Sequence, residues 1–223
     1  MAPRSVRRLL ALALLRAASA TITIACAGDS TTEGDAAKGY PYPIVLQDFL
    51  GDGFEVKNWG VGGRTVVDHK SRDYRDTDEY DEMLAEGFDV LIITLGTNDA
   101  KANDEYTYWH DEATWVAEYV AMLDDIVAKV PGVTAIYVGT PPPIYGVGNY
   151  EDMYAYSREI VHDTLQRLTR DVVADLSARV DFYVGVVDFF EALGGDDPIG
   201  EDYKDAVHTP GPTFSHKQRP TMS

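Results

Sequence analysis

Five short runs of apolar and β-branched residues are spaced along the chain and predict five β-strands. Each run is almost continuously hydrophobic, which is typical of strands in a parallel sheet that helices cover on both faces. The predicted strands are Thr21–Ala27, Phe54–Trp59, Asp89–Leu95, Thr134–Gly139 and Phe182–Asp188.

Between these runs, apolar positions recur every three or four residues and predict amphipathic helices. The two long stripes are Val116, Val120, Leu123, Val127 and Val130, then Val161, Leu165, Leu168, Val172 and Leu176. Asp111 or Thr114 is expected to cap the first of these helices, and Pro131-Gly132 to end it. Shorter helices are expected over Tyr42–Leu50 and Glu79–Glu86. Alternation of strands and helices predicts an α/β fold, a three-layer α/β/α sandwich with a central, mainly five-stranded parallel sheet.

Length and composition narrow the class of protein. The 223 residues suit one domain, and 45% hydrophobic residues suffice for a substantial core. The formal charge of −18 argues against nucleic acid or anionic membrane surfaces as partners, because both would repel the protein. The single cysteine, Cys26, excludes an internal disulfide and a zinc site built from cysteines.

The amino-terminal residues differ from the rest of the chain. A basic start precedes the apolar run Leu9–Leu15, and Ala18-Ser19-Ala20 is a small-residue cleavage pattern, so residues 1–20 are predicted to be a secretory signal peptide. Cleavage would leave 15 basic against 37 acidic side chains, a charge of −22. An organellar transit peptide and a retained basic helix remain alternatives. The apolar run is too short to span a bilayer, so no stable membrane anchor is expected.

Polar residues follow the ends of four predicted strands. These segments are 28–34 (GDSTTEG), 58–65 (NWGVGGRT), 96–99 (GTND) and 205–208 (DAVH). In an open parallel sheet, ligands bind beyond the carboxyl ends of the strands. The topology therefore predicts that a hydroxyl, a carboxamide, an imidazole and a carboxylate meet at one rim.

In this order, the four segments resemble blocks I, II, III and V of the SGNH-hydrolase (GDSL-type) esterase and lipase family. Their detail is similar to sialate O-acetylesterase-like and carbohydrate-esterase-like members. The resemblance implies a flavodoxin-like SGNH hydrolase domain over residues 21–208, followed by a polar tail, 209–223, which is predicted to be loop or disorder. It further implies an ester hydrolase that works by covalent serine catalysis.

The resemblance assigns a catalytic triad of Ser30, His208 and Asp205. Ser30 would be the nucleophile, His208 the base that takes its proton, and Asp205 the group that orients the imidazole. Taken alone, Ser30 would be read as a helix cap and His208 as a surface residue. The other histidines lack comparable spacing from an acid and are expected to be surface or packing residues: His69, His110, His162 and His216.

The resemblance also assigns an oxyanion hole. Its donors would be the backbone N–H groups of Ser30 and Gly63 and the carboxamide of Asn98. Without the family pattern, the same residues would be read as an Asx turn at Asn98 and a tight loop at Gly63. No nucleotide-binding or metal-binding motif occurs in the sequence, so no metal or other cofactor is implied.

The substrate is indicated only weakly by the sequence. Arg64, Tyr145 and Asn149 follow predicted strands and are candidates for substrate binding. The absence of an apolar lid favours a short acyl group, so removal of acetyl groups from a carbohydrate or glycan by a monomeric enzyme is expected. The alternatives are a lysophospholipase or thioesterase acting on longer chains, and an SGNH-like domain that binds glycans with little turnover. Two departures from the family pattern, Ala206 in place of glycine and Pro210 one position late, lie beside His208.

Overall fold

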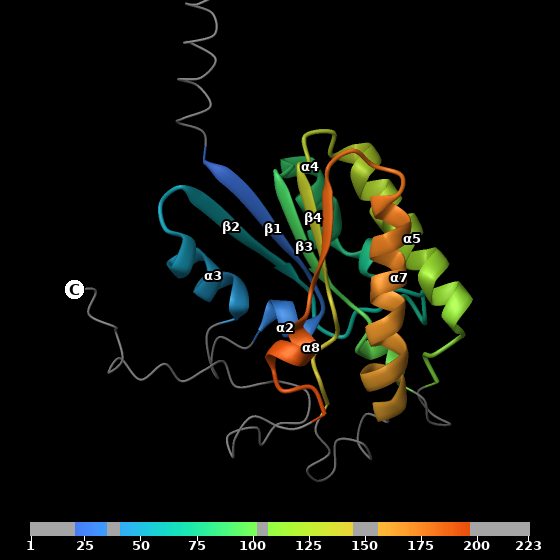
Figure 1. Ribbon diagram of the computed structural model, residues 1–223. Coiled ribbons are helices and arrows are strands. Elements are labelled where there is room, and N and C mark those ends of the chain that lie inside the picture. Colours follow the sequence, from blue (N-terminus) through green and yellow to red (C-terminus); the bar gives the residue numbers. More distant parts are fainter. Residues whose placement is uncertain (1–20, 35–40, 102–106, 145–155, 197–223) are drawn as a thin grey trace, which may run out of the picture.

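The chain is described by a computed structural model over residues 21–34, 41–101, 107–144 and 156–196. A sheet of five parallel strands forms its centre (Figure 1). The strands are β1 (Ile22–Gly28), β2 (Phe54–Gly60), β3 (Val90–Thr94), β4 (Ala135–Gly139) and β5 (Tyr183–Val187). Their order across the sheet is β2-β1-β3-β4-β5, the doubly wound arrangement of flavodoxin-like folds. The predicted fold class and all five strands are confirmed, with ends that differ by one residue.

The strand register brings the functional segments to one edge. Gly28, the last residue of β1, pairs with Gly60 at the end of β2 and with Thr94 at the end of β3. Because the strands are parallel, the segments that follow them leave from the same edge of the sheet.

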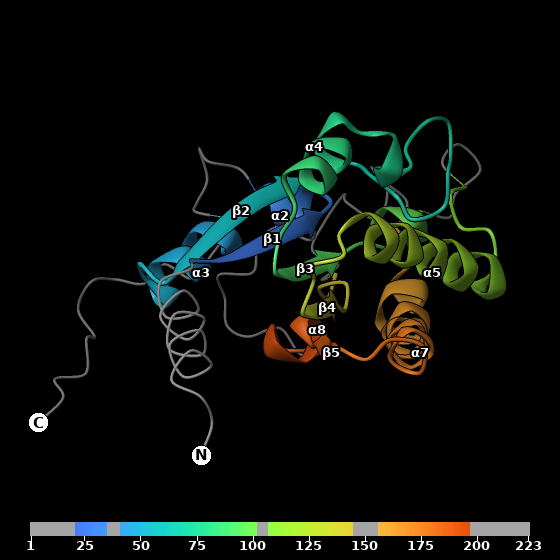
Figure 2. The ribbon, with the colours of Figure 1, turned by 90° about the horizontal axis from the view of Figure 1, so that it is seen from above.

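Helices cover both faces of the sheet (Figure 2). One face carries α4 (Asp78–Glu86), α5 (Glu112–Lys129) and α7 (Leu165–Ser177). The other carries α3 (Tyr42–Leu50) and the short α8 (Phe189–Ala192), and the rings of Tyr42 and Phe189 lie 5.5 Å apart. The structure is thus the predicted three-layer sandwich.

The buried face of α5 is rotated from the predicted stripe. Its fully buried side chains are Trp115, Tyr119, Met122, Leu123 and Ile126, whereas Val116, Val120 and Val127 are only partly buried at the margin of the core. The two aromatic rings pack edge to face, 5.1 Å apart. Large side chains fill the centre of the contact because they bury the most apolar area, so the small valines flank it. The cap is Asp111, whose side chain accepts a hydrogen bond from the backbone N–H of Thr114.

The second predicted stripe is fully buried, but its first turn is not α-helical. Residues Ile160–Thr164 form a π-helical turn, η3, before α7 begins. His162 lies in this turn with its side chain buried, and its Nδ1 lies 2.8 Å from Oδ1 of Asp196. This position agrees with the prediction of a packing residue.

The predicted leader, 1–20, and tail, 209–223, lie outside the described residues and stay predictions. Within the described ranges, no helix has the length and apolar character needed to cross a membrane. Those ranges also contain no group of three or more His, Cys, Asp or Glu side chains arranged to hold a metal ion.

Candidate active site

Ser30 begins a single helical turn, α2 (Ser30–Glu33), directly after β1. The cap of this turn is Asp29, whose buried carboxylate accepts hydrogen bonds from the backbone N–H of Thr31 at 2.9 Å and from its hydroxyl at 2.8 Å. Ser30 is therefore not the cap. Its hydroxyl makes no hydrogen bond to any residue that the structure describes, and the residue is half-buried. This leaves the hydroxyl available for chemistry.

Two glycines allow the segment after β2 to approach α2 closely. A Cβ atom on Gly60 would overlap the backbone of Glu33, so only glycine fits. A Cβ atom on Gly62 would lie 3.7 Å from Cβ of Ser30 and 2.7 Å from Oε2 of Glu33. The glycine-rich loop thus runs immediately beside Ser30, as the predicted arrangement requires.

Gly63, the predicted oxyanion donor, has a φ of +76°, in the left-handed region that disfavours residues with a side chain. A Cβ atom at this position would also lie 3.1 Å from Nη1 of Arg72. Both observations explain why this position is glycine. Whether its N–H donates to a bound substrate stays a prediction.

Asn98, in the 3₁₀ turn η2 (Asn98–Ala100) after β3, is only 3% exposed. Its Nδ2 donates to the carbonyl oxygen of Arg64 at 3.1 Å and lies 3.5 Å from Oδ2 of Asp29. Its Oδ1 accepts a hydrogen bond from the hydroxyl of Tyr156 at 3.1 Å. Because a carbonyl oxygen only accepts hydrogen bonds, the contact with Arg64 identifies which end of the amide is the donor. The carboxamide is therefore held in one orientation.

Asp99 fastens the glycine-rich loop to the sheet. Its fully buried Oδ1 accepts from the backbone N–H groups of Val66 and Val67, each at 3.0 Å. Burial raises the pKa of this carboxyl to about 7, against the opposing effect of these hydrogen bonds, and the nearby charge of Asp29 adds to the rise. Because Asn98 and Asp99 are adjacent, the same turn fixes both the position of the glycine-rich loop and the position of the Asn98 carboxamide.

The loop that follows has an unusual backbone. Lys70 and Ser71 have φ values of 52° and 62°, uncommon for residues other than glycine, and such strain persists only where neighbouring contacts impose it. Here the Asp68 carboxylate accepts from the N–H of Ser71 at 3.1 Å. Nη1 of Arg64 donates to the carbonyl oxygen of Ser71 at 3.0 Å. Arg64, a predicted substrate-binding residue, thus also holds this loop.

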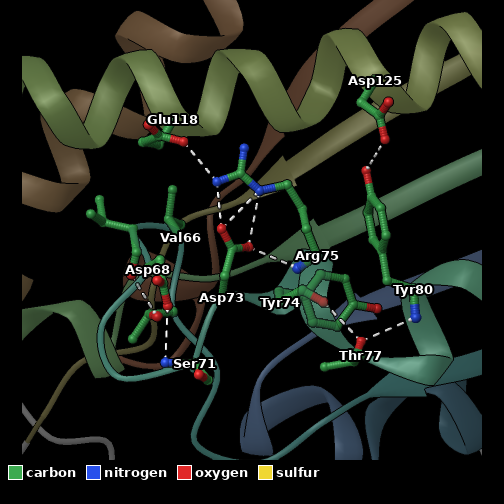
Figure 3. Close-up of polar contacts among 12 residues, drawn as sticks. Val66, Asp68, Ser71, Asp73, Tyr74, Arg75, Thr77, Tyr80, Glu118 and Asp125 are labelled. Atoms are coloured by element: carbon green, nitrogen blue, oxygen red, sulfur yellow. Dashed lines mark hydrogen bonds and ion pairs between the residues drawn. The ribbon is translucent and has the colours of Figure 1, made fainter.

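The far end of the loop is anchored on the helical layer, as Figure 3 shows. Arg75, in the 3₁₀ turn η1 (Tyr74–Asp76), forms ion pairs with both Asp73 and Glu118 of α5. The Tyr80 hydroxyl of α4 donates to Asp125 of α5 at 2.9 Å. Contacts at both ends therefore hold the loop in place beside Ser30.

The predicted residues divide into two groups. Ser30, Gly63, Arg64 and Asn98 are gathered at the carboxyl edge of β1, β2 and β3. Asp205, His208, Tyr145 and Asn149 lie outside the described residues, so their roles stay predictions. Sequence reasoning missed Asp99 and Tyr156 as supports of the site. Asp99 stands next to the predicted site residue Asn98, and this adjacency could have indicated its role. Tyr156 is 58 positions from its partner Asn98, and nothing in the sequence indicates that the two meet.

Comparison with known proteins places this arrangement in a family. Residues 26–209 match the GDSL-like Lipase/Acylhydrolase family. An acetylxylan esterase of Xylanibacter ruminicola is 43% identical over 83 residues, which are 36% of this chain and 17% of that protein. The match thus spans only a small part of that relative.

Solved structures show the same fold. A carbohydrate acetylesterase from Sinorhizobium meliloti superposes with a TM-score of 0.62 at 20% identity, covering 85% of this chain and 91% of the other. An aryl esterase from M. smegmatis gives 0.61 at 23% identity, covering 84% and 90%. The sequence match covers most of the chain, and the predicted family is confirmed. The chain belongs to the GDSL-like lipase/acylhydrolase family.

Proposed function

We propose that this protein removes acetyl groups from a carbohydrate by covalent catalysis at Ser30. The Ser30 oxygen attacks the ester carbonyl carbon while His208, oriented by Asp205, takes the hydroxyl proton. The imidazole returns this proton to the leaving sugar oxygen, and an acetyl-enzyme remains. Water then attacks the acetyl group with His208 again as base, which releases acetate and restores the serine.

Negative charge develops on the carbonyl oxygen in both steps. The N–H groups of Ser30 and Gly63 and the Asn98 carboxamide would donate to it. This role is supported by the fixed orientation of the carboxamide, because the Tyr156 hydroxyl holds Oδ1 and leaves Nδ2 as the donor end; the oxyanion would share or replace the present contact of Nδ2 with the carbonyl oxygen of Arg64. The proposal rests on the position of Ser30. Asp29, not Ser30, caps α2, so the Ser30 hydroxyl is not used as a cap, and Ser30 lies beside the glycine-rich loop.

The choice of substrate rests on the relatives. A carbohydrate acetylesterase and an acetylxylan esterase are among the proteins similar to this chain. Small acyl groups also agree with the absence of an apolar lid in the sequence. A short acyl chain on a sugar is therefore preferred over a lysophospholipid or thioester.

The test compares hydrolysis of p-nitrophenyl acetate, butyrate and octanoate by the wild type, Ser30→Ala and Ser177→Ala. Ser177 is exposed at the end of α7 and is a matched control. We expect Ser177→Ala to retain activity and Ser30→Ala to lose at least about 10³-fold in kcat, since the covalent step is removed. Equal rates for the wild type and Ser30→Ala would refute the mechanism. Preference for octanoate would favour the longer-chain alternative, and binding of acetylated glycan without turnover would favour the binding domain.

We also propose that residues 1–20 direct secretion. The proposal rests on the basic, apolar and small-residue order of the leader. Amino-terminal sequencing of secreted protein should begin at Thr21, and any other start would contradict the assigned cleavage site.

A further inference from the structure

Most arginines in the described ranges are neutralised by carboxylates, as expected in so acidic a protein. Of the seven that these ranges contain, five form ion pairs: Arg75, Arg158, Arg167, Arg170 and Arg179. The remaining two are Arg64 and Arg72, for which the described residues provide no carboxylate partner. Both lie beside Gly63, the proposed oxyanion donor, in the candidate active site.

The two arginines have different surroundings. The Arg64 guanidinium donates to the carbonyl oxygen of Ser71 and so supports the loop. The Arg72 guanidinium lies over the Tyr108 ring, 5.7 Å from its centroid, and donates to no group in the described part of the chain. Its Nη1 would be 3.1 Å from a Cβ atom on Gly63. Arg72 is exposed and lies within reach of a ligand at Gly63, while its backbone carbonyl is fixed by the N–H of Thr65 at 2.9 Å.

A second cation lies on the same ring. Nζ of Lys101 is 5.3 Å from the Tyr108 centroid and 5.2 Å from that of Tyr156, and the residue is only 8% exposed. Burial first, and then the charge of Arg72, lower the pKa of Lys101 to about 8. The carboxylate of Asp29 opposes this shift, so the charge of Lys101 is already partly balanced inside the site and Arg72 is the exposed cation of the pair.

Carboxylates near the site limit where an anion could bind. Asp29 is buried and engaged by Thr31, and Glu33 lies on the Gly62 side of the loop. Both would repel an anion at Ser30 itself. Attraction is therefore confined to the Arg72 side of Gly63, and the ester and the anionic group must be separate parts of one substrate.

We propose that Arg72 binds a carboxylate carried by the alcohol part of the substrate, so that the enzyme prefers acetyl esters on sugars bearing a uronic acid group. This inference rests on the proposed acetylesterase function. An acetyl group has no charge, so the anion must belong to the sugar. The planar guanidinium donates two parallel hydrogen bonds to a carboxylate, a geometry that no lysine offers.

The test uses two sugars that differ only in the anionic group: methyl glucoside and methyl glucuronoside, each acetylated at the same hydroxyl. Acetate release is measured for the wild type, Arg72→Gln, Arg72→Lys and the exposed control Arg167→Gln. For Arg72→Gln we expect KM to rise about tenfold on the glucuronoside and less than twofold on the glucoside, since one charge-assisted contact is lost. The KM of Arg72→Lys on the glucuronoside should lie between those of the wild type and Arg72→Gln, because lysine keeps the charge but cannot donate two parallel hydrogen bonds. The KM of Arg167→Gln should match that of the wild type. Circular dichroism and melting temperatures check that each variant folds.

A second readout does not depend on turnover of a sugar ester. Free glucuronate should inhibit hydrolysis of p-nitrophenyl acetate competitively in the wild type, and at least about fivefold more weakly in Arg72→Gln. Glucose should not inhibit either protein at the same concentrations. Sulfate that inhibits as strongly as glucuronate would overturn the carboxylate assignment.

The outcomes separate this inference from the function on which it rests. If the wild type hydrolyses none of these esters, the acetylesterase proposal fails and the inference fails with it. If p-nitrophenyl acetate is hydrolysed but Arg72→Gln changes KM equally for both sugars, only the inference fails. An equal fall in kcat on both sugars would also overturn it, because Arg72 would then act on the oxyanion rather than on the sugar.

Discussion

Asp99 offers a sharp test of how the loop beside Ser30 is held. In Asp99→Ala the backbone N–H groups of Val66 and Val67 lose their acceptor while they remain buried. An unsatisfied buried donor costs about 1–3 kcal/mol, so the free energy of unfolding should fall by about 2–6 kcal/mol. That is a large part of the 5–15 kcal/mol typical of a domain. The loss of kcat should exceed the rise in KM, because the displaced loop carries Gly63.

The pH dependence of the free energy of unfolding distinguishes the effect of the Asp99 charge from the effect of its hydrogen bonds. Oδ1 of Asp99 accepts both N–H groups, so Asp99→Asn keeps these two bonds through its amide oxygen and loses only the second contact of the Val66 N–H, at 3.1 Å from Oδ2. The folded-state pKa of about 7 lies above the ordinary value of 3.8, so the folded protein binds this proton more tightly than the unfolded chain. The resulting stabilisation is fully present below about pH 4 and is lost as the pH rises through 7. At 1.36 kcal/mol per pH unit over about three units, the loss is at most about 4 kcal/mol.

The assay is urea unfolding at pH values from 4 to 8. We expect the free energy of unfolding of the wild type to fall relative to that of Asp99→Asn across this range. Asp163→Asn, which alters an exposed aspartate of the π-helical turn, should follow the wild type at every pH and is the control. Parallel curves for the wild type and Asp99→Asn would refute the linkage argument. An Asp99→Ala protein as stable as the wild type would refute the role of Asp99 in holding the loop.

Two further predictions concern the oxyanion hole. Tyr156→Phe removes the hydroxyl that donates to Oδ1 of Asn98. In steady-state kinetics, kcat should fall about tenfold on charged and neutral esters alike, with KM nearly unchanged. An unchanged kcat would show that Tyr156 does not position the carboxamide. Gly63→Ala places a side chain at a φ of +76° and against Arg72, which should cost about 1–3 kcal/mol and lower the melting temperature. A melting temperature equal to that of the wild type would show that this backbone is not constrained.

The strands and the long helices follow from local patterns in the sequence. Runs such as Asp89–Leu95 are hydrophobic enough to be buried on both faces, and the observed strand, Val90–Thr94, is one residue shorter at each end. The predicted apolar stripe on α5 differs from the observed buried face, because apolar residues recur every three or four positions on both of two neighbouring faces of this helix. Only packing against the sheet selected the face of Trp115 and Tyr119, whose rings bury the larger area.

The candidate site shows the same division. The family motifs placed Ser30, Gly63 and Asn98 at one edge of the sheet, because parallel strands direct the segments that follow them to the same side. Local sequence could not decide between Asp29 and Ser30 as the cap of α2, since both residue types cap helices well. The hydrogen bonds from Asp29 to Thr31 decide it.

The sequence by itself determined the succession of strands and helices and the family, because both are written in local periodicity or in short motifs. Only the tertiary structure decided what supports the residues of the candidate site. Tyr156, whose hydroxyl donates to Asn98, stands 58 positions from it and is brought near by the fold. Such contacts join positions far apart in the chain and depend on how whole elements pack, so no local pattern encodes them.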